Sequence, residues 1–168
     1  MKAVLLSIRP EWCDLIIRHK KTVELRKTCP RLQTPFKVYI WCTKARMFWA
    51  RVHGNGWQQL DERVIGEFIC DDIRRIGPEY CVVKEDIESA ISGSCLTVPQ
   101  VKDYAGWKSG MSYADLKDLY GWHISDLKIY DEPVKLKNFQ AKRLDRRGGG
   151  LKDVCDPPQS WFYVEDGR

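Results

Sequence analysis

The sequence predicts an α+β domain built on a small, curled, mostly antiparallel β-sheet of barrel-like form with inserted helices. Two observations lead to this fold class. The apolar runs are short, rarely longer than about eight residues, and turn signals separate them. Helical patterns fall between some of these runs, but strands and helices do not alternate as a parallel βαβ fold demands. At 168 residues the chain can bury roughly 70% of its unfolded surface, so we expect a single domain over residues 1–168.

The expected strands are short runs of apolar and β-branched residues. Residues 36–42 give the clearest strand, because aromatic and branched side chains occupy both of its sides. Within residues 64–76, Gly66 predicts a bulge or tight bend, and Glu67 must lie on a wet face or be held by a base. In chain order, the strands are expected over residues 3–8, 22–27, 36–42, 64–76, 122–130 and 159–164.

The expected helices carry start signals or a helical spacing of apolar residues. Pro10 suits the first turn of a helix of about ten residues. Residues 82–92 place apolar side chains four apart with acids between them. A further helical stretch opens at Thr97, and the Ser112 and Asp115 pair resembles a capping box for a helix over residues 112–120.

Two stretches rich in basic residues lie between these elements. Residues 43–59 interleave Lys, Arg and His with Phe and Trp, which favours either base stacking and phosphate contacts or a long loop tied down by its aromatic rings. Residues 142–152 combine basic side chains with three consecutive glycines, so a mobile loop is expected there.

The cysteine pattern indicates a reducing compartment. Seven cysteines, an odd number, contain no Cys-x-x-Cys pair, which argues against a disulfide framework and against a zinc ribbon. Most lie in apolar runs, as expected of reduced core thiols. No apolar run has the length of a membrane span, and the N-terminal residues do not resemble an export signal. We therefore expect a cytoplasmic protein with no metal site and no cofactor.

Positive charge is concentrated at the start of the chain. Residues 1–51 contain 12 Lys or Arg against three acids, a net charge of +9, whereas the rest of the chain has a net charge of −4. Such asymmetry favours an anionic partner, most often nucleic acid, although a solvated basic face is the alternative. In the strand expected over residues 22–27, Glu24 and Arg26 share one face and Val23 and Leu25 share the other. The charged face is either a ligand site or an ordinary solvated strand edge.

Three charged residues at this strand match a known signature. Lys21, Glu24 and Arg26, which enter a strand directly after a helix, resemble the Gly-x-Lys-x-x-Glu-x-Arg signature of ASCH (activating signal cointegrator homology) domains, small β-barrels of the PUA-like superfamily. The surrounding order is similar too, with a Ser-Ile-Arg-Pro segment at residues 7–10 before the helix and a closing Ser-Trp-Phe-Tyr-Val strand at residues 160–164.

The resemblance implies a protein that binds RNA or a modified nucleotide in a cleft beneath the signature. Some members resemble enzymes, including amidohydrolases that deacetylate acetylated cytidine and proteins credited with ribonuclease activity. A threonine stands at the position of Glu24 in the amidohydrolase branch, so the resemblance favours binding over catalysis here. His19 replaces the glycine of the signature, at a point where helix ends usually need a left-handed residue.

The side chains of the signature suit a nucleotide ligand. Arg26 can hold a phosphate or carbonyl through a planar fork, and Lys21 can do so as a point charge. Glu24 can pair with Arg26, read a base amino group or act as a general base. The other candidate ligand contacts are aromatic rings for stacking and polar groups at strand ends, each with a structural role as its alternative: Trp12, Trp122, Trp161, His123 and Ser7.

Three functions are consistent with these patterns. The leading hypothesis is RNA or modified-nucleotide binding through a cationic cleft formed by Lys21, Glu24 and Arg26. The second is a small hydrolase, a nucleoside amidohydrolase or a ribonuclease, with Lys21 and Glu24 as candidate catalytic residues. The third is an interaction module whose basic surface docks an acidic protein.

Overall fold

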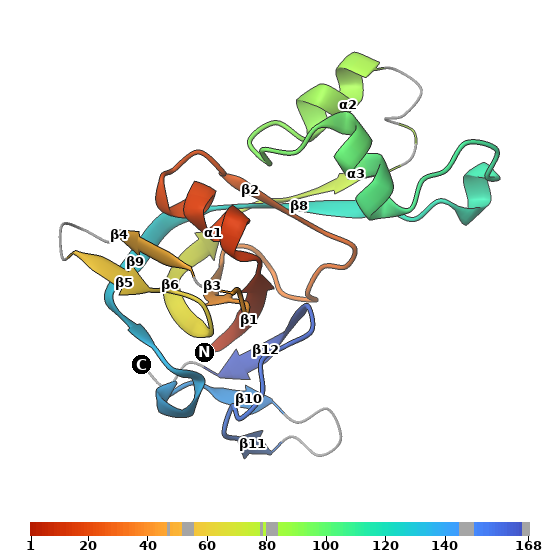
Figure 1. Cartoon of the computed structure of the whole chain (residues 1–168). Coiled ribbons are helices and arrows are strands. Elements are labelled where there is room, and N and C mark those ends of the chain that lie inside the picture. The colour runs from red at the N-terminus through yellow and green to blue at the C-terminus, as the bar shows by residue number, and fades with distance from the viewer. Residues whose placement is uncertain (47, 52–55, 78, 80–83, 145–149, 166–168) are drawn as a thin grey trace. The chain divides into compact units, whose positions relative to one another are not determined.

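The computed structural model of the chain describes residues 1–46, 48–51, 56–77, 79, 84–144 and 150–165 (Figure 1). Its elements form two compact units. The first unit contains Met1–Arg18, Phe36–Ile69 and Asp126–Arg168, and the second contains His19–Pro35 and Cys70–Ser125. Helices and strands are mixed and strands predominate, which confirms the α+β class. A single folding domain over residues 1–168 stays a prediction.

A seven-stranded sheet forms the body of the first unit (Figure 1). Its strands are β1 (Lys2–Ile8), β3 (Phe36–Cys42), β6 (Arg63–Cys70), β9 (Ser125–Val134), β10 (Lys142–Leu144), β11 (Leu151–Lys152) and β12 (Trp161–Glu165). Their order in the sheet is β11-β10-β12-β1-β3-β6-β9. β1 pairs antiparallel with β12 and parallel with β3. Among the described residues the sheet ends at β11 and β9 and is not closed into a barrel, so barrel closure stays a prediction.

The parallel pairing of β1 with β3 requires a crossover connection. The chain between the two strands supplies it and includes helix α1 (Pro10–Ile17), which begins at Pro10 as the sequence predicts. Cys13 and Ile16 are the buried residues of this helix. The N-terminal strand and helix are therefore confirmed, with the helix ending slightly earlier than expected.

Apolar side chains from β1, β3 and β12 form the core of the first unit. Val38 and Ile40 lie on one side of β3, and Tyr39 and Trp41 lie on the other. All four side chains are buried. Glu67 of β6 accepts a hydrogen bond of 2.5 Å from the Tyr130 hydroxyl. Lys37 also lies 3.6 Å from this carboxylate, so of the two alternatives expected for Glu67, a wet face or a base that holds it, the structure shows the second. The core cluster consists of Ala3, Leu5, Tyr39, Trp41, Val64, Leu136, Ala141, Val154, Phe162 and Val164.

Several expected boundaries in the middle of the chain were wrong. The loop expected over residues 43–59 contains a hairpin of β4 (Trp49–Arg51) and β5 (Trp57–Gln59), because these short runs, each beginning with a tryptophan, pair with each other. The strand expected over residues 64–76 divides into β6 and β7 (Ile73–Ile76), since two consecutive aspartates interrupt its apolar run. The strand expected over residues 122–130 likewise divides, into β8 (Leu119–His123) and β9.

The basic loop expected at residues 142–152 is bounded by two short paired strands. β10 and β11 pair antiparallel, and Lys142 forms an ion pair with Asp153. Residues 145–149 lie outside the described residues, so the mobility of this loop stays a prediction.

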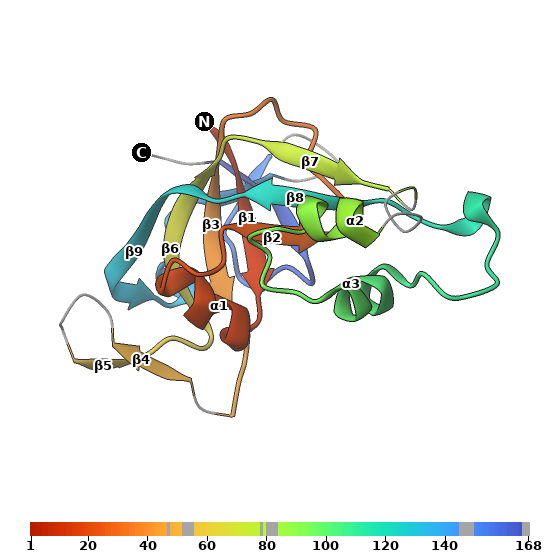
Figure 2. The same ribbon diagram turned by 90° about the horizontal axis from the view of Figure 1, so that it is seen from above.

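The second unit is a three-stranded antiparallel sheet with helices packed against it. The strand order is β2 (Val23–Arg26), β8, β7. Helices α2 (Lys84–Ala90) and α3 (Val98–Ala105) lie close to these strands (Figure 2). Apolar residues from the sheet and the helices form one buried cluster: Leu25, Ile76, Ile87, Ala90, Ile91, Val101, Trp107 and Leu119.

The capping signals in the sequence correctly predict one helix of this unit and wrongly predict another. Thr97 caps α3 through a capping box, in which its hydroxyl and backbone N–H each engage Gln100. The helix expected over residues 112–120 was wrong: only a single 3-10 turn forms, at Tyr113–Asp115. Leu119 already belongs to β8, so strand pairing overrides the local helical signal.

Candidate functional site

The sheet of the second unit has one apolar face and one face of charged and aromatic side chains. Residues directly opposite each other in antiparallel strands project to the same side of the sheet. Leu25 of β2, together with Leu119 and Ile76, lies in the apolar cluster. The alternate residues form what we call the charged face: Glu24, Trp122 and Ile73 in one row of the register, and Arg26, Tyr120 and Arg75 in the next. The predicted alternation of Glu24 and Arg26 against Val23 and Leu25 is therefore confirmed.

Glu24 is the centre of a buried ion network on this face. Its Oε1 lies 2.9 Å from Arg26 Nη2, and its Oε2 lies 3.2 Å from Lys21 Nζ. Lys21 also donates a 2.6 Å hydrogen bond to the Ser94 carbonyl. The exposed fractions of the Lys21, Glu24 and Arg26 side chains are 2%, 8% and 11%. A solvated strand edge is therefore excluded, and the three predicted residues come together as one group of two cations and one carboxylate.

The turn before β2 fixes the position of Lys21. His19 has a left-handed backbone, with a φ of 55°, at the position where the signature has glycine. The backbone N–H groups of Thr22 and Val23 then both donate to the Gly93 carbonyl. Gly93 has a φ of +80°, and a Cβ there would lie 2.3 Å from Thr22 Oγ1. Only glycine fits this close approach, which holds the chain after α2 against the start of β2.

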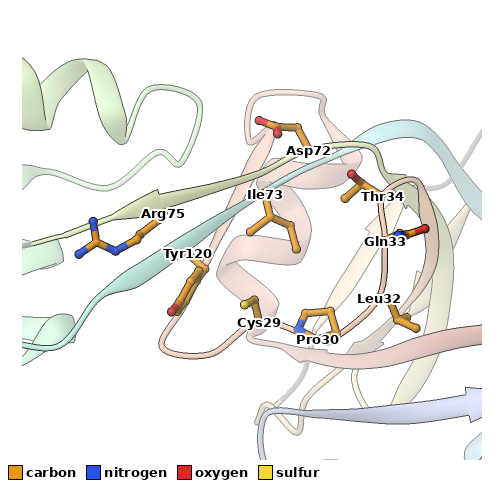
Figure 3. Close-up of a pocket in the computed structure, with 9 residues that line it drawn as sticks. All are labelled: Cys29, Pro30, Leu32, Gln33, Thr34, Asp72, Ile73, Arg75 and Tyr120. Atoms are coloured by element: carbon orange, nitrogen blue, oxygen red, sulfur yellow. The ribbon is translucent and has the colours of Figure 1, made fainter.

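A hollow of about 560 Å³ opens on the charged face. Figure 3 shows Tyr120 of β8 and Ile73 of β7 on neighbouring strands, opposite the chain segment at residues 29–34. Arg26 lies directly opposite Tyr120 in the sheet register, so one member of the ion network neighbours a residue that lines the hollow. The lining residues are Cys29, Pro30, Leu32, Gln33, Thr34, Asp72, Ile73, Arg75 and Tyr120. Sequence reasoning missed this hollow, because its residues come from three separate segments.

Acidic partners hold the guanidinium of Arg75 at the edge of the hollow. Asp118 accepts two hydrogen bonds from it, at 2.7 and 2.8 Å, and Glu79 accepts a third at 2.6 Å. The bonds to Asp118, and then that to Glu79, raise the pKa of Arg75. Two carboxylates against one cation leave a net negative charge here, so Arg75 adds hydrogen-bonding groups to the site but no excess positive charge.

His123 lies on the opposite side of the sheet from Glu24 and pairs with an aspartate. Its Nδ1 is 2.6 Å from Asp71 Oδ1, and both side chains are nearly half exposed. This hydrogen bond is the main cause of the lowered pKa of the Asp71 carboxyl. The neighbouring Cys70 is buried, and burial raises the pKa of its thiol to about 12. The Cys70 thiol is therefore no nucleophile for the histidine to activate.

The other predicted site residues occupy structural positions. Trp122 lies on the charged face but has no exposed surface, so it presents no ring to a base. Ser7, Trp12 and Trp161 belong to the first unit. Ser7 is buried and donates a 2.5 Å hydrogen bond to the Pro158 carbonyl. Trp161 packs edge to face against Tyr163, with ring centroids 5.3 Å apart. Trp12 is partly buried on α1.

Metal-binding clusters and membrane-spanning helices are both absent from the described part of the chain. No group of three or more His, Cys, Asp or Glu side chains there is arranged to hold a metal ion. No helix among those residues is long and apolar enough to cross a membrane.

Comparison with known proteins identifies the fold. No protein-family model and no curated protein sequence matches the chain. Crystal structures of the ASCH protein of Zymomonas mobilis do match. One point mutant has a TM-score of 0.61 at 18% identity, over 97% of this chain and 88% of that chain. The chain has the ASCH fold. A second point mutant has a TM-score of 0.59 at 19% identity, over 98% and 91%. The unmutated protein has a TM-score of 0.59 at 19% identity, over 97% and 87%.

The ASCH fold confirms the resemblance drawn from the Lys21, Glu24 and Arg26 spacing. At 18–19% identity the match concerns the fold, and it transfers no residue role from the Zymomonas protein to this chain. The function of the charged face therefore depends on the chemistry and geometry of its own residues.

Proposed function

We propose that this ASCH-fold chain is an RNA-binding domain that holds RNA or a modified nucleotide at its charged face. The observation that supports it best is the gathering of Lys21 and Arg26 on the one carboxylate of Glu24. Two cations against one anion leave an excess of positive charge in a poorly solvated place, where it acts strongly on a phosphate or a carbonyl. Glu24 fixes both cations before a ligand arrives, which reduces the entropy lost on binding.

The hollow beside the network suits the base or sugar of a nucleotide. Its volume of about 560 Å³ lies within the range of roughly 300–1,000 Å³ of small-molecule pockets. Tyr120 supplies an aromatic ring, and Gln33 and Thr34 supply donors and acceptors for a base edge. Arg75 is already matched by acids, so we assign the phosphate to Arg26 and Lys21.

The charge distribution of the chain supports the same ligand class. The net charge of +9 over residues 1–51 attracts polyanions and makes their binding dependent on salt. All six cysteines of the described residues are free thiols, as expected in a reducing compartment. We therefore propose a cytoplasmic location for the protein and its RNA ligand.

The test is RNA binding by variants that remove one cation and keep one ion pair. Lys21→Met leaves the Arg26–Glu24 pair, and Arg26→Met leaves the Lys21–Glu24 pair. We expect each to weaken binding of single-stranded RNA, measured by fluorescence anisotropy over a salt series. Each lost phosphate contact should make the slope of log K against log salt shallower by about 0.7.

Arg18→Met is the matched control, because it also removes one positive charge. Arg18 is 62% exposed and pairs with Asp14 on α1. We expect its effect to be small. The proposal fails if the unaltered protein has no affinity for RNA at low salt, or if Arg18→Met weakens binding as much as Lys21→Met. Displacement of RNA by an acidic protein at the same site would instead support the docking function.

A hydrolase is the second candidate function, and the contact of Lys21 with Glu24 is the observation that favours it. Both oxygens of Glu24 are engaged in ion pairs, however, so neither points at a substrate, and binding is the better supported function. Incubation with acetylated cytidine and with labelled RNA tests hydrolysis. Turnover that Lys21→Met abolishes would establish an enzyme, and absence of turnover on both substrates would reject this form of the hypothesis.

A further inference from the structure

Two tryptophans are exposed on the β4–β5 hairpin of the first unit. Trp49 is 49% exposed and Trp57 is 67% exposed. The other five tryptophans of the chain, all at described positions, are buried or only partly exposed. Figure 2 shows the hairpin projecting from the remainder of its unit. Large apolar rings left in solvent on a projecting ribbon commonly mark a binding surface.

The register of the hairpin places both rings on the same face. Trp49 lies opposite Gln59, and Trp57 lies opposite Arg51. Trp49 and Trp57 are thus diagonal neighbours, and such neighbours on one face lie about 7–8 Å apart. This separation is about two of the 3.4 Å steps between bases along a strand. Two rings so placed can each take a base of the same strand.

The opposite face of the hairpin is fixed to the unit. Ala50 is buried, and Gln58 beside it donates a 2.7 Å hydrogen bond to the Asp131 carbonyl of β9. At the base of the hairpin, the buried Asp61 carboxylate accepts a 3.2 Å hydrogen bond from the Phe48 backbone N–H. It also accepts a 3.4 Å bond from the Gln59 side chain. These bonds hold the strands that carry the tryptophans against the unit before a ligand arrives, which lowers the entropy cost of binding.

The charges around the hairpin select nucleic acid as the occupant. Residues 36–60 of the first unit, which include the hairpin, contain four Lys or Arg and no Asp or Glu. Lys44 and Arg46, which precede β4, are exposed. Basic side chains beside exposed aromatic rings fit a single strand, whose phosphates meet the cations while its bases stack on the rings. A hydrophobic protein partner would not require these cations beside the exposed rings.

We propose that Trp49 and Trp57 stack on unpaired bases of single-stranded RNA. The inference rests on the proposed function and extends it, since it assigns a second contact surface and specifies unpaired bases. A paired duplex keeps its bases within the helix, so the hairpin contributes nothing to duplex binding. Stacking also tolerates all four bases, so the hairpin adds affinity without sequence preference.

The experiment measures dissociation constants for a single-stranded RNA and for a duplex of equal length. Trp49→Ala and Trp57→Ala should each weaken single-strand binding about fivefold or more, in keeping with base–aromatic stacking. Trp57→Phe should retain most of the affinity, whereas Trp57→Leu should not, because leucine is apolar but has no π face. Duplex affinity should stay unchanged in all four variants.

Leu151→Ala is the matched control, because Leu151 is 50% exposed in the first unit on a different hairpin. It should leave single-strand affinity unchanged, and all variants should keep the unfolding temperature of the unaltered protein. Equal affinity of the alanine variants and the unaltered protein would overturn the inference while the proposed function stands. Full single-strand affinity of Trp57→Leu would also overturn the inference. A change in self-association of the variants without a change in RNA affinity would do the same. Absence of any RNA binding by the unaltered protein would reject the proposed function itself.

Discussion

Glu24 is predicted to be more important for stability than either cation that it binds. We consider two nearly isosteric substitutions in the network, Glu24→Gln and Lys21→Met. Glu24→Gln leaves Lys21 and Arg26 facing each other across a neutral amide, in positions where their side chains are 2% and 11% exposed. Lys21→Met leaves the 2.9 Å contact between Arg26 and Glu24 intact. The carboxylate is shared by both pairs, whereas each cation belongs to one.

The expected magnitudes follow from burial. Removal of one partner from a buried ion group typically costs about 3–5 kcal/mol, because it leaves uncompensated charge. We expect Glu24→Gln to lower the free energy of unfolding by about that amount. Lys21→Met loses one ion contact and the hydrogen bond to Ser94, and it leaves a neutral pair, so we expect a loss of about 1–2 kcal/mol. The difference between the two variants should therefore exceed about 1 kcal/mol.

Urea unfolding followed by circular dichroism and tryptophan fluorescence measures both values. The m-values should match that of the unaltered protein, so that midpoint differences report stability. The double variant should show a coupling energy of about 0.5–3 kcal/mol between Lys21 and Glu24. A loss from Lys21→Met equal to or larger than that from Glu24→Gln would refute the shared role of Glu24. Losses below about 0.5 kcal/mol for both would refute the buried network as a source of stability.

Three further predictions concern the backbone and the buried thiol. Gly93→Ala should destabilise the protein by about 1–3 kcal/mol more than Gly110→Ala in thermal unfolding, because both have positive φ but only Gly93 has Thr22 within reach of a new Cβ. His19→Gly should raise the unfolding temperature by an amount equivalent to about 0.5–1 kcal/mol, since glycine adopts φ > 0 without strain; a lower temperature would contradict this. The raised pKa of Cys70 contributes stability that is full below the thiol's usual pKa near 9 and is lost as the pH rises to about 12. Cys70→Ala should therefore make the decline of stability between these pH values shallower, by at most about 1.4 kcal/mol per pH unit; an unchanged slope would show that the thiol does not contribute.

Several local elements were predictable because they depend on neighbouring residues. Residues 36–42 are so rich in aromatic and β-branched residues that their strand needed no tertiary information, and Pro10 marked the start of its helix. Thr97 and Gln100 carry the capping box in the sequence itself. The helix predicted over residues 112–120 does not form. One 3-10 turn satisfies the local capping signal, and Leu119 and the residues after it pair in the sheet instead.

The sequence by itself determined which residues form the charged group. The two-residue period of a strand places Glu24 and Arg26 on one face, and their spacing from Lys21 carries the resemblance to the ASCH signature. That spacing does not reveal whether the face is wet, and the tertiary structure showed it to be buried. The hollow beside it was equally invisible, because Cys29, Asp72 and Tyr120 meet only after three distant segments have paired. The burial of the charged group and the meeting of the residues that line the hollow both depend on contacts between distant parts of the chain. The periodicity of side chains along one strand carries no information about such contacts.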